Sequence, residues 1–169
     1  MKDIAIREAT ADDIPAIVRV RRAAFTEEEV RGWTTPGRSI FYSRPALRAA
    51  WDKNDTLKEG WKIAVAECGG SISGFIVFGV KDGCGFIENL NVAKPQQRLG
   101  VGKALVLYVE NSAKAAGCRL MKTDTTENAD GIPWKSYGFW MKMGYKDTGE
   151  RLPTEWDFKE IRFVKELML

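Results

Sequence analysis

The 169-residue sequence contains no histidine. Histidine is the commonest general base and metal ligand at neutral pH, so hydrolases built on Ser-His-Asp or Cys-His pairs are excluded. Any acid–base chemistry must use Asp, Glu, Tyr, Cys, Lys or bound water.

Cysteine is scarce as well, with only Cys68, Cys84 and Cys118. Their odd number and wide spacing indicate neither a disulfide framework nor a Cys-x-x-Cys metal clip, so we expect no metal site. No apolar run approaches the roughly 18 residues of a membrane span, and Met1 to Ala5 lack the apolar core of a signal peptide. We therefore expect a cytoplasmic protein without a membrane partner.

Charge of one sign is also lacking. The net charge is only +3, and no basic run is interleaved with aromatic residues. This argues against a nucleic-acid partner. The length is that of one domain, and 44% hydrophobic and 29% charged residues are typical of a globular protein.

Hydrophobic periodicity predicts alternating strands and helices. Three antiparallel strands in succession, followed by a strand–helix–strand crossover, indicate an α/β fold. We predict one domain over residues 1–169, with a mixed, mostly antiparallel central sheet flanked by helices. The expected strands are 3–9, 62–66, 72–78, 86–92, 118–123 and a closing pair within 145–148 and 157–164; the expected helices are 10–26, 45–51, 100–116 and a short one around 137–143.

The stretch from Gly85 to Ala116 carries the main chemical signal. A strand is stopped by Pro95, and a turn with Gly100 and Gly102 opens a helix. The first N–H groups of a helix lack intrahelical partners, and glycines let an anion approach the backbone. The turn therefore predicts a phosphate site, to which Arg98 and Lys103 add positive charge.

Two nucleotide-binding motifs do not fit this turn. A P-loop requires Ser or Thr after the lysine, and Ala104 stands there. The dinucleotide fingerprint requires a third glycine, where the chain has Leu105.

The pattern Gln97-x-x-Gly100-x-Gly102, after a strand ending Leu90-Asn91-Val92, resembles the acetyl-CoA site of the GNAT family of N-acetyltransferases. Phe139 to Tyr145 is similar to that family's Phe/Leu-Tyr-x-Lys-x-Gly-Phe segment, and the resemblance covers most of the chain. It implies an acyl-CoA N-acyltransferase-like fold, with acetyl-CoA as co-substrate and direct transfer of acetyl to a primary amine.

The same resemblance implies which residues bind the cofactor. The pyrophosphate would lie on the N–H groups from Arg98 to Lys103, a backbone N–H near Val92 would donate to the thioester oxygen, and Asn128 would contact the pantetheine arm. The full set is Leu90, Asn91, Val92, Gln97, Arg98, Leu99, Gly100, Val101, Gly102, Lys103, Asn128 and Trp140.

Two departures concern catalysis. Trp140 stands where the family has a tyrosine that protonates the leaving thiolate, and an indole N–H cannot supply a proton. The interval from Asn128 to Trp140 is also longer than usual, with residues 130–133 as the apparent insertion. Tyr137, three residues before Trp140 on a neighbouring part of the helical face, is a hypothetical replacement acid, although a packing role is at least as common.

The amine must lose a proton before it attacks, because a lysine-like ammonium has a pKa of about 10.4. Glu88 and Asp124 are the candidate bases. Period-2 alternation puts Glu88 on an apolar face with Phe86 and Leu90, where desolvation would make it a stronger base. Pairing of Glu88 with a basic neighbour is an equally weighted alternative.

The acceptor is left open: a small molecule, a polyamine, a peptide or the N-terminal amine of a protein. In the resembling family the segment before the second strand covers the acceptor, so Trp33, Phe41, Tyr42 and Trp51 are candidates for its wall, whereas Glu27 to Glu29 is more typical of a solvated charge run. A non-catalytic acyl-CoA-binding or sensor domain on the same fold is the alternative function, and a homodimer is also left open.

Overall fold

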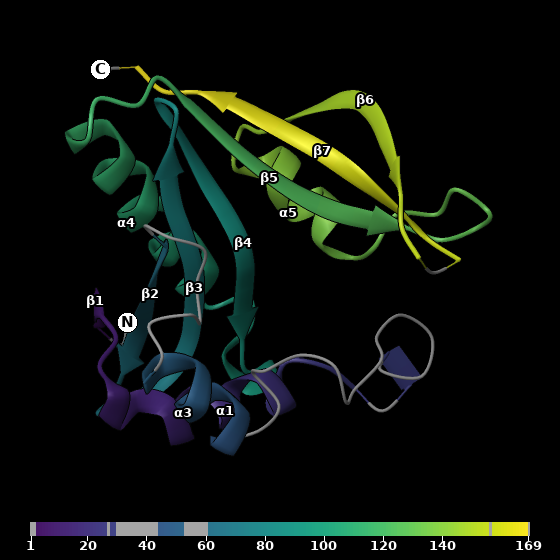
Figure 1. The fold of residues 1–169 in the computed structure, drawn as a ribbon. Coiled ribbons are helices and arrows are strands. Elements are labelled where there is room, and N and C mark those ends of the chain that lie inside the picture. The colour runs from purple at the N-terminus through teal and green to yellow at the C-terminus, as the bar shows by residue number, and fades with distance from the viewer. Residues whose placement is uncertain (1–2, 27, 30–43, 53–60, 156, 169) are drawn as a thin grey trace. The chain divides into compact units, whose positions relative to one another are not determined.

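The computed structural model describes residues 3–26, 28–29, 44–52, 61–155 and 157–168 (Figure 1). The main elements, in chain order, are β1 (Ile4–Glu8), α1 (Ile14–Ala23), α3 (Arg44–Asp52), β2 (Trp61–Cys68), β3 (Ser71–Lys81), β4 (Cys84–Val92), α4 (Val101–Ala115), β5 (Leu120–Glu127), α5 (Ser136–Lys142), β6 (Lys146–Pro153) and β7 (Lys159–Glu166). Glu27, Trp33, Phe41 and Tyr42, named above, lie outside the described residues.

The strands form a seven-stranded sheet in the order β1-β2-β3-β4-β5-β7-β6. Four of the neighbouring pairs, β1–β2, β2–β3, β5–β7 and β6–β7, are antiparallel, and β4–β5 is parallel. The predicted α/β class with a mixed, mostly antiparallel sheet is therefore confirmed. None of the helices in the described ranges is both long enough and apolar enough to cross a membrane.

The chain divides into two compact units, and the first contains residues 1–79 and 89–109. Its core packs α1 and α3 against β2 and β3, through side chains that include Ile17, Leu47 and Phe75. The β2–β3 hairpin turns at Gly69 and Gly70, with φ of 58° and 81°. Positive φ at both positions is the geometry that matches the twist of paired strands, as the Gly-Gly pair predicts.

The start of α1 follows the predicted cap. The Thr10 backbone N–H donates to Asp13 Oδ2 at 2.8 Å, and Arg7 donates to both oxygens of the same carboxylate. A 3₁₀ turn over Ala11–Asp13 precedes the helix, which ends at Ala23 rather than near residue 26. The strong cap thus sets the first turn, whereas the sequence did not mark the end.

The second unit contains residues 80–88 and 110–169. Residues Cys84–Ile87 of β4 pair in parallel with Leu120–Thr123 of β5, which confirms the predicted crossover. Met121, Ile161 and Phe163 are fully buried in this unit. Met121 packs directly against Gly85, so a Cβ at residue 85 would collide with the Met121 side chain. The same Cβ would lie 3.0 Å from Ala113 Cβ of α4.

A buried carboxylate on α4 was missed by the apolar pattern. Glu110 is 4% exposed, accepts a hydrogen bond from the Tyr145 hydroxyl at 3.1 Å, and pairs with Lys165 Nζ at 2.8 Å. Burial first, and then the neighbouring carboxylate, raise the pKa of Tyr145 far above its usual value. The ion pair satisfies a charge that the helical stripe alone would assign to solvent.

Candidate active site

The loop that follows β4 in the first unit is built by short-range hydrogen bonds. Ala93 N–H donates to Ser73 O at 2.9 Å, and Lys94–Gln96 forms a 3₁₀ turn with Pro95 inside it. Pro95 has no N–H for a sheet ladder, so the strand ends as predicted. The chain is thereby turned from β4 into the start of α4.

Gln97 fixes this loop from the inside. Its Nε2 donates to Val92 O at 2.9 Å and to Ala24 O at 3.1 Å, and its backbone N–H donates to Lys94 O at 3.2 Å. All three of its N–H groups are thus used within the chain. In this structure Gln97 links the end of α1 to the end of β4 and has no donor left for a phosphate.

The backbone N–H groups of residues 98–103 form the most distinctive feature of the site. Arg98 has φ of 64° and Gly100 has φ of 89°. The first bond into α4 runs from Ala104 N–H to Gly100 O at 3.0 Å, and among the described residues none of the six preceding N–H groups has a backbone acceptor. Left-handed residues within such a run make an anion-binding concavity of consecutive amides.

The charge around these amides favours an anion. The first turn of α4 carries no acidic residue, and the helix dipole places partial positive charge at this end. Arg98, Leu99 and Gly100 are exposed, and so is Lys103. Neither Arg98 nor Lys103 forms an ion pair with a described residue. A phosphate here would meet two cations and a row of amides.

Gly74 of β3 holds the start of α4 close to the sheet. A Cβ at Gly74 would lie 3.0 Å from both Asn91 O and Val101 Cγ1, and 3.2 Å from Leu105 Cδ1. A side chain at residue 74 would therefore push the first turns of α4 away from β3. The close packing at Gly74 therefore fixes the position of the N–H groups of residues 98–103, which we call the amide row.

Asn91, near the end of β4, is buried at 2% exposure and faces α1. Its Oδ1 accepts a hydrogen bond from Arg21 Nη1 at 2.6 Å, and the Arg21 guanidinium lies 4.7 Å from the centre of the Phe25 ring. Within the described chain its Nδ2 has no acceptor. A buried donor of this kind usually carries a free-energy penalty, so it is an unusual feature.

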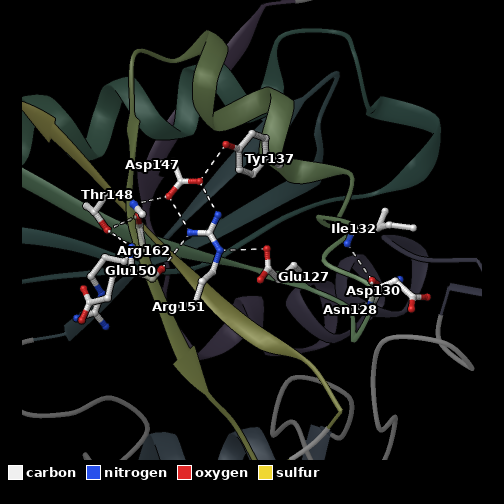
Figure 2. A network of polar contacts seen from close by, with 11 residues as sticks. Glu127, Asn128, Asp130, Ile132, Tyr137, Asp147, Thr148, Glu150, Arg151 and Arg162 are labelled. Atoms are coloured by element: carbon white, nitrogen blue, oxygen red, sulfur yellow. Dashed lines mark hydrogen bonds and ion pairs between the residues drawn. The ribbon is translucent and has the colours of Figure 1, made fainter.

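In the second unit Tyr137 belongs to a polar network (Figure 2). Its hydroxyl donates to Asp147 Oδ2 at 3.0 Å, Arg151 donates to both oxygens of Asp147 at 2.8 and 2.9 Å, and Arg151 Nε donates to Glu127 at 3.0 Å. The hydrogen bond to Asp147, together with burial, raises the pKa of Tyr137. The Tyr137 hydroxyl therefore points its proton toward Asp147. Use of Tyr137 as an acid would require this hydrogen bond to break.

The insertion before α5 forms a closed turn, also visible in Figure 2. Asn128 Oδ1 accepts from the N–H groups of Asp130 at 3.0 Å and Ile132 at 2.9 Å, and Gly131 has φ of 74°. Glu127 pairs with Pro133 as an isolated bridge. The longer interval is therefore a turn at the end of β5, and the oxygen of Asn128 is used inside it.

Neither candidate base, Glu88 or Asp124, is a buried, desolvated carboxylate. Glu88 is exposed, so the desolvation expected for it on an apolar face, one of the two alternatives, is not found. Asp124 is also exposed and forms an ion pair with Arg162 Nε at 3.1 Å. The other alternative for Glu88, an ion pair with a basic neighbour, is not found among the described residues either.

Trp140 is buried at 4% exposure, with ring centroids 5.1 Å from both Phe139 and Tyr145. Both contacts have edge-to-face geometry, which stabilises aromatic clusters. The indole therefore contributes to the core of the second unit. Its assignment to the cofactor stays a prediction.

Comparison with known proteins decides the family. The family model described as Acetyltransferase (GNAT) family matches residues 23–145, well over half of the chain. The chain belongs to the GNAT acetyltransferase family. The matched range includes the amide row and α5, so this GNAT acetyltransferase carries the motif region of its family. A search of curated protein sequences found no match.

Solved structures show the same fold. An aminoglycoside 6'-N-acetyltransferase in complex with coenzyme A is 16% identical, with a TM-score of 0.71 and 98% of each chain covered. The PaiA N-acetyltransferase of Thermoplasma acidophilum, also in complex with coenzyme A, is 18% identical with a TM-score of 0.66, covering 95% of this chain and 98% of that chain. An N-acetyltransferase from Staphylococcus aureus is 18% identical with a TM-score of 0.67, covering 98% and 99%.

Some polar groups of this GNAT acetyltransferase had no signal in the sequence. The contacts of Arg21 with Asn91 and of Asp147 with Arg151 join residues whose types are ordinary at their positions. A basic residue on a helix and an acidic residue in a hairpin are usually solvated. Only the fold shows that the first pair is partly buried and that the second is bidentate.

Proposed function

We propose that this protein transfers the acetyl group of acetyl-CoA to a primary amine by direct attack. The observation that carries the proposal is the row of N–H groups from residues 98–103 at the start of α4. The CoA pyrophosphate is a dianion, and consecutive amides at a helix N-terminus are suited to it. Coenzyme A bound to two proteins of the same fold supports this choice of anion.

The amine nitrogen forms a bond to the thioester carbon, the carbon–sulfur bond breaks, and the CoA thiolate leaves. A proton passes from the amine to a base, and the thiolate takes up a proton. Glu88 is the favoured base because it forms no ion pair with any basic residue in the described part of the chain, whereas Asp124 is held by Arg162. A backbone N–H near Val92 would polarise the thioester oxygen, with Leu90, Asn91 and Val92 lining the acyl arm; one such donor typically lowers a barrier by about 2.7–4 kcal/mol.

The proton for the thiolate has no strong protein donor at the family position, because Trp140 is buried and cannot act as an acid. Tyr137 is the candidate from the same helix, provided that its bond to Asp147 opens in the complex. Water is the other source. A CoA thiolate is a good leaving group near neutral pH, since thiols have pKa values of about 8.5, so an acid is less critical here than a base.

The experiment is to measure thiol release from acetyl-CoA with a panel of polyamines, amino acids and peptides, and to weigh the product by mass spectrometry. We expect release that depends on the amine, with a product heavier by one acetyl group. CoA binding without release for any amine, including protein N-termini, would instead support a non-catalytic acyl-CoA-binding protein. Release without an acetylated amine would mean thioester hydrolysis.

A further inference from the structure

The Asn91 amide is oriented by a contact that leaves no second arrangement. Arg21 Nη1 can only donate, so the atom of Asn91 that faces it at 2.6 Å must be the oxygen. The NH₂ group is thereby turned to the other side. Nδ2 is buried, and none of the described residues accepts a hydrogen bond from it.

The surroundings hold this amide in place. The end of α1 is joined to the end of β4 by Gln97, whose side chain donates to Ala24 O and Val92 O. The Arg21 guanidinium packs on the Phe25 ring one turn further along. These contacts hold the segments that carry Arg21 and Asn91, and the bond from Arg21 fixes the direction of the Asn91 amide.

A buried donor without an acceptor is costly to folding and is explained most simply by a ligand that supplies the acceptor. The group that fits is an oxygen, because Nδ2 can only donate. The guanidinium bonded to the same amide polarises it and makes its N–H a stronger donor. A carbonyl oxygen or a carboxylate satisfies both conditions, whereas an ammonium group would meet donors and positive charge.

We propose that Asn91, oriented by Arg21, binds a carboxylate or carbonyl oxygen of the amine acceptor and so selects amines that carry such a group near the reactive nitrogen. The inference rests on the proposed acetyl transfer, since it concerns the second substrate. It assigns the Asn91 side chain to the acceptor, and leaves the backbone of β4 to the acyl arm.

Three amines that share the same aminoalkyl chain test this selection. Lysine carries a carboxylate, lysinamide carries a neutral carbonyl, and cadaverine carries neither. The variant is Asn91→Asp, which keeps an oxygen for Arg21 and removes the N–H donor. Asn89→Asp is the matched control, because it makes the same change two residues earlier on the same strand.

The measured quantity is kcat/KM for lysine and lysinamide relative to cadaverine, from thiol release. In the unaltered protein we expect the ratio for lysine to exceed one, and the ratio for lysinamide to exceed one as well when the recognised group is a carbonyl. In Asn91→Asp each ratio above one falls at least about tenfold, as expected for loss of one hydrogen bond to a charged or polarised group, and in Asn89→Asp the ratios are unchanged. Selection for lysine alone would identify the group as a carboxylate, and equal selection would identify a carbonyl.

A binding measurement separates this inference from the proposed function. Nuclear magnetic resonance of the Asn91 side-chain NH₂, in protein saturated with CoA, needs no turnover. The signal should move on titration with lysine or lysinamide and not with cadaverine. Equal responses to the three amines, no response to lysine and lysinamide, or an equal loss of all three activities in Asn91→Asp would overturn the inference. Thiol release absent for every amine would count against the proposed function alone.

Discussion

Replacement of Gly100 by alanine is the perturbation that separates anion binding from folding. Gly100 has φ of 89°, and the nearest atom to an added Cβ would be Ile4 Cδ1 at 4.0 Å, so the chain itself leaves room. Gly117, at the other end of the same helix, has φ of 81° and nothing within 4 Å of an added Cβ. Gly117→Ala is therefore a matched control for the backbone cost.

Both variants should lose about 1–2 kcal/mol of unfolding free energy, because a side chain disfavours the left-handed region. Only Gly100→Ala should also weaken CoA binding, since relaxation of φ turns amides away from the phosphates. Loss of one charge-assisted hydrogen bond, worth about 1.5–3 kcal/mol, corresponds to an affinity about 10- to 150-fold lower.

The assays are urea unfolding for stability and calorimetric titration with CoA for affinity. Pantetheine, which lacks the pyrophosphate, serves as a second ligand whose binding should not distinguish the two variants. An equal loss of CoA affinity in Gly100→Ala and Gly117→Ala would refute the reasoning, because the effect would then follow stability. Unchanged CoA affinity in Gly100→Ala would refute it as well.

Three further predictions concern side chains. Gln97→Ala should lower the unfolding free energy by about 1–3 kcal/mol in urea, because Val92 O and Ala24 O lose their donor, whereas Gln96→Ala should change it by less than about 0.5 kcal/mol. Glu88→Gln should reduce kcat/KM about a hundredfold near pH 7 and less at alkaline pH, where the amine is already neutral. An unchanged pH profile would show that Glu88 is not the general base. The same loss in Asp124→Asn instead would assign the general base to Asp124. Hydrogen bonds from Arg151 lower the pKa of Asp147 from 3.8 to about 2, so the charge of Asp147 stabilises the fold above pH 4 and this contribution fades toward pH 2. Asp147→Asn should therefore lower the unfolding free energy by about 2 kcal/mol at pH 7 and by little at pH 2. A loss of unfolding free energy that does not depend on pH would contradict this.

Local chemistry explains what the sequence could predict. Pro95 has no N–H and Gly100 tolerates positive φ, so the strand end and the helix start depend on single residues. The Gly69-Gly70 turn similarly sets the β2–β3 pairing, in which Cys68 lies opposite Ser71. These features need no knowledge of distant neighbours.

The predictions that were wrong, and the contacts that the sequence did not reveal, depend on residues distant in the chain. Alternation assigned Glu88 to an apolar face, but exposure of a strand residue is decided by what packs over it, and nothing in the local pattern contains that information. Glu110 is buried although the local pattern assigns it to solvent. Tyr145 and Lys165, which come from remote segments of the chain, offset the free-energy cost of burying its charge. The Gln97 side chain shows the same limit: the motif identifies the residue, and the fold shows that it holds the loop.

The most direct test of the acetyl-CoA site is nuclear magnetic resonance of the backbone amides during titration with CoA and, separately, with pantetheine. The proposal predicts that the N–H signals of residues 98–103 shift most with CoA, because these groups gain phosphate acceptors, and that they stay in place with pantetheine. Saturable CoA binding that leaves these six signals unmoved would contradict it.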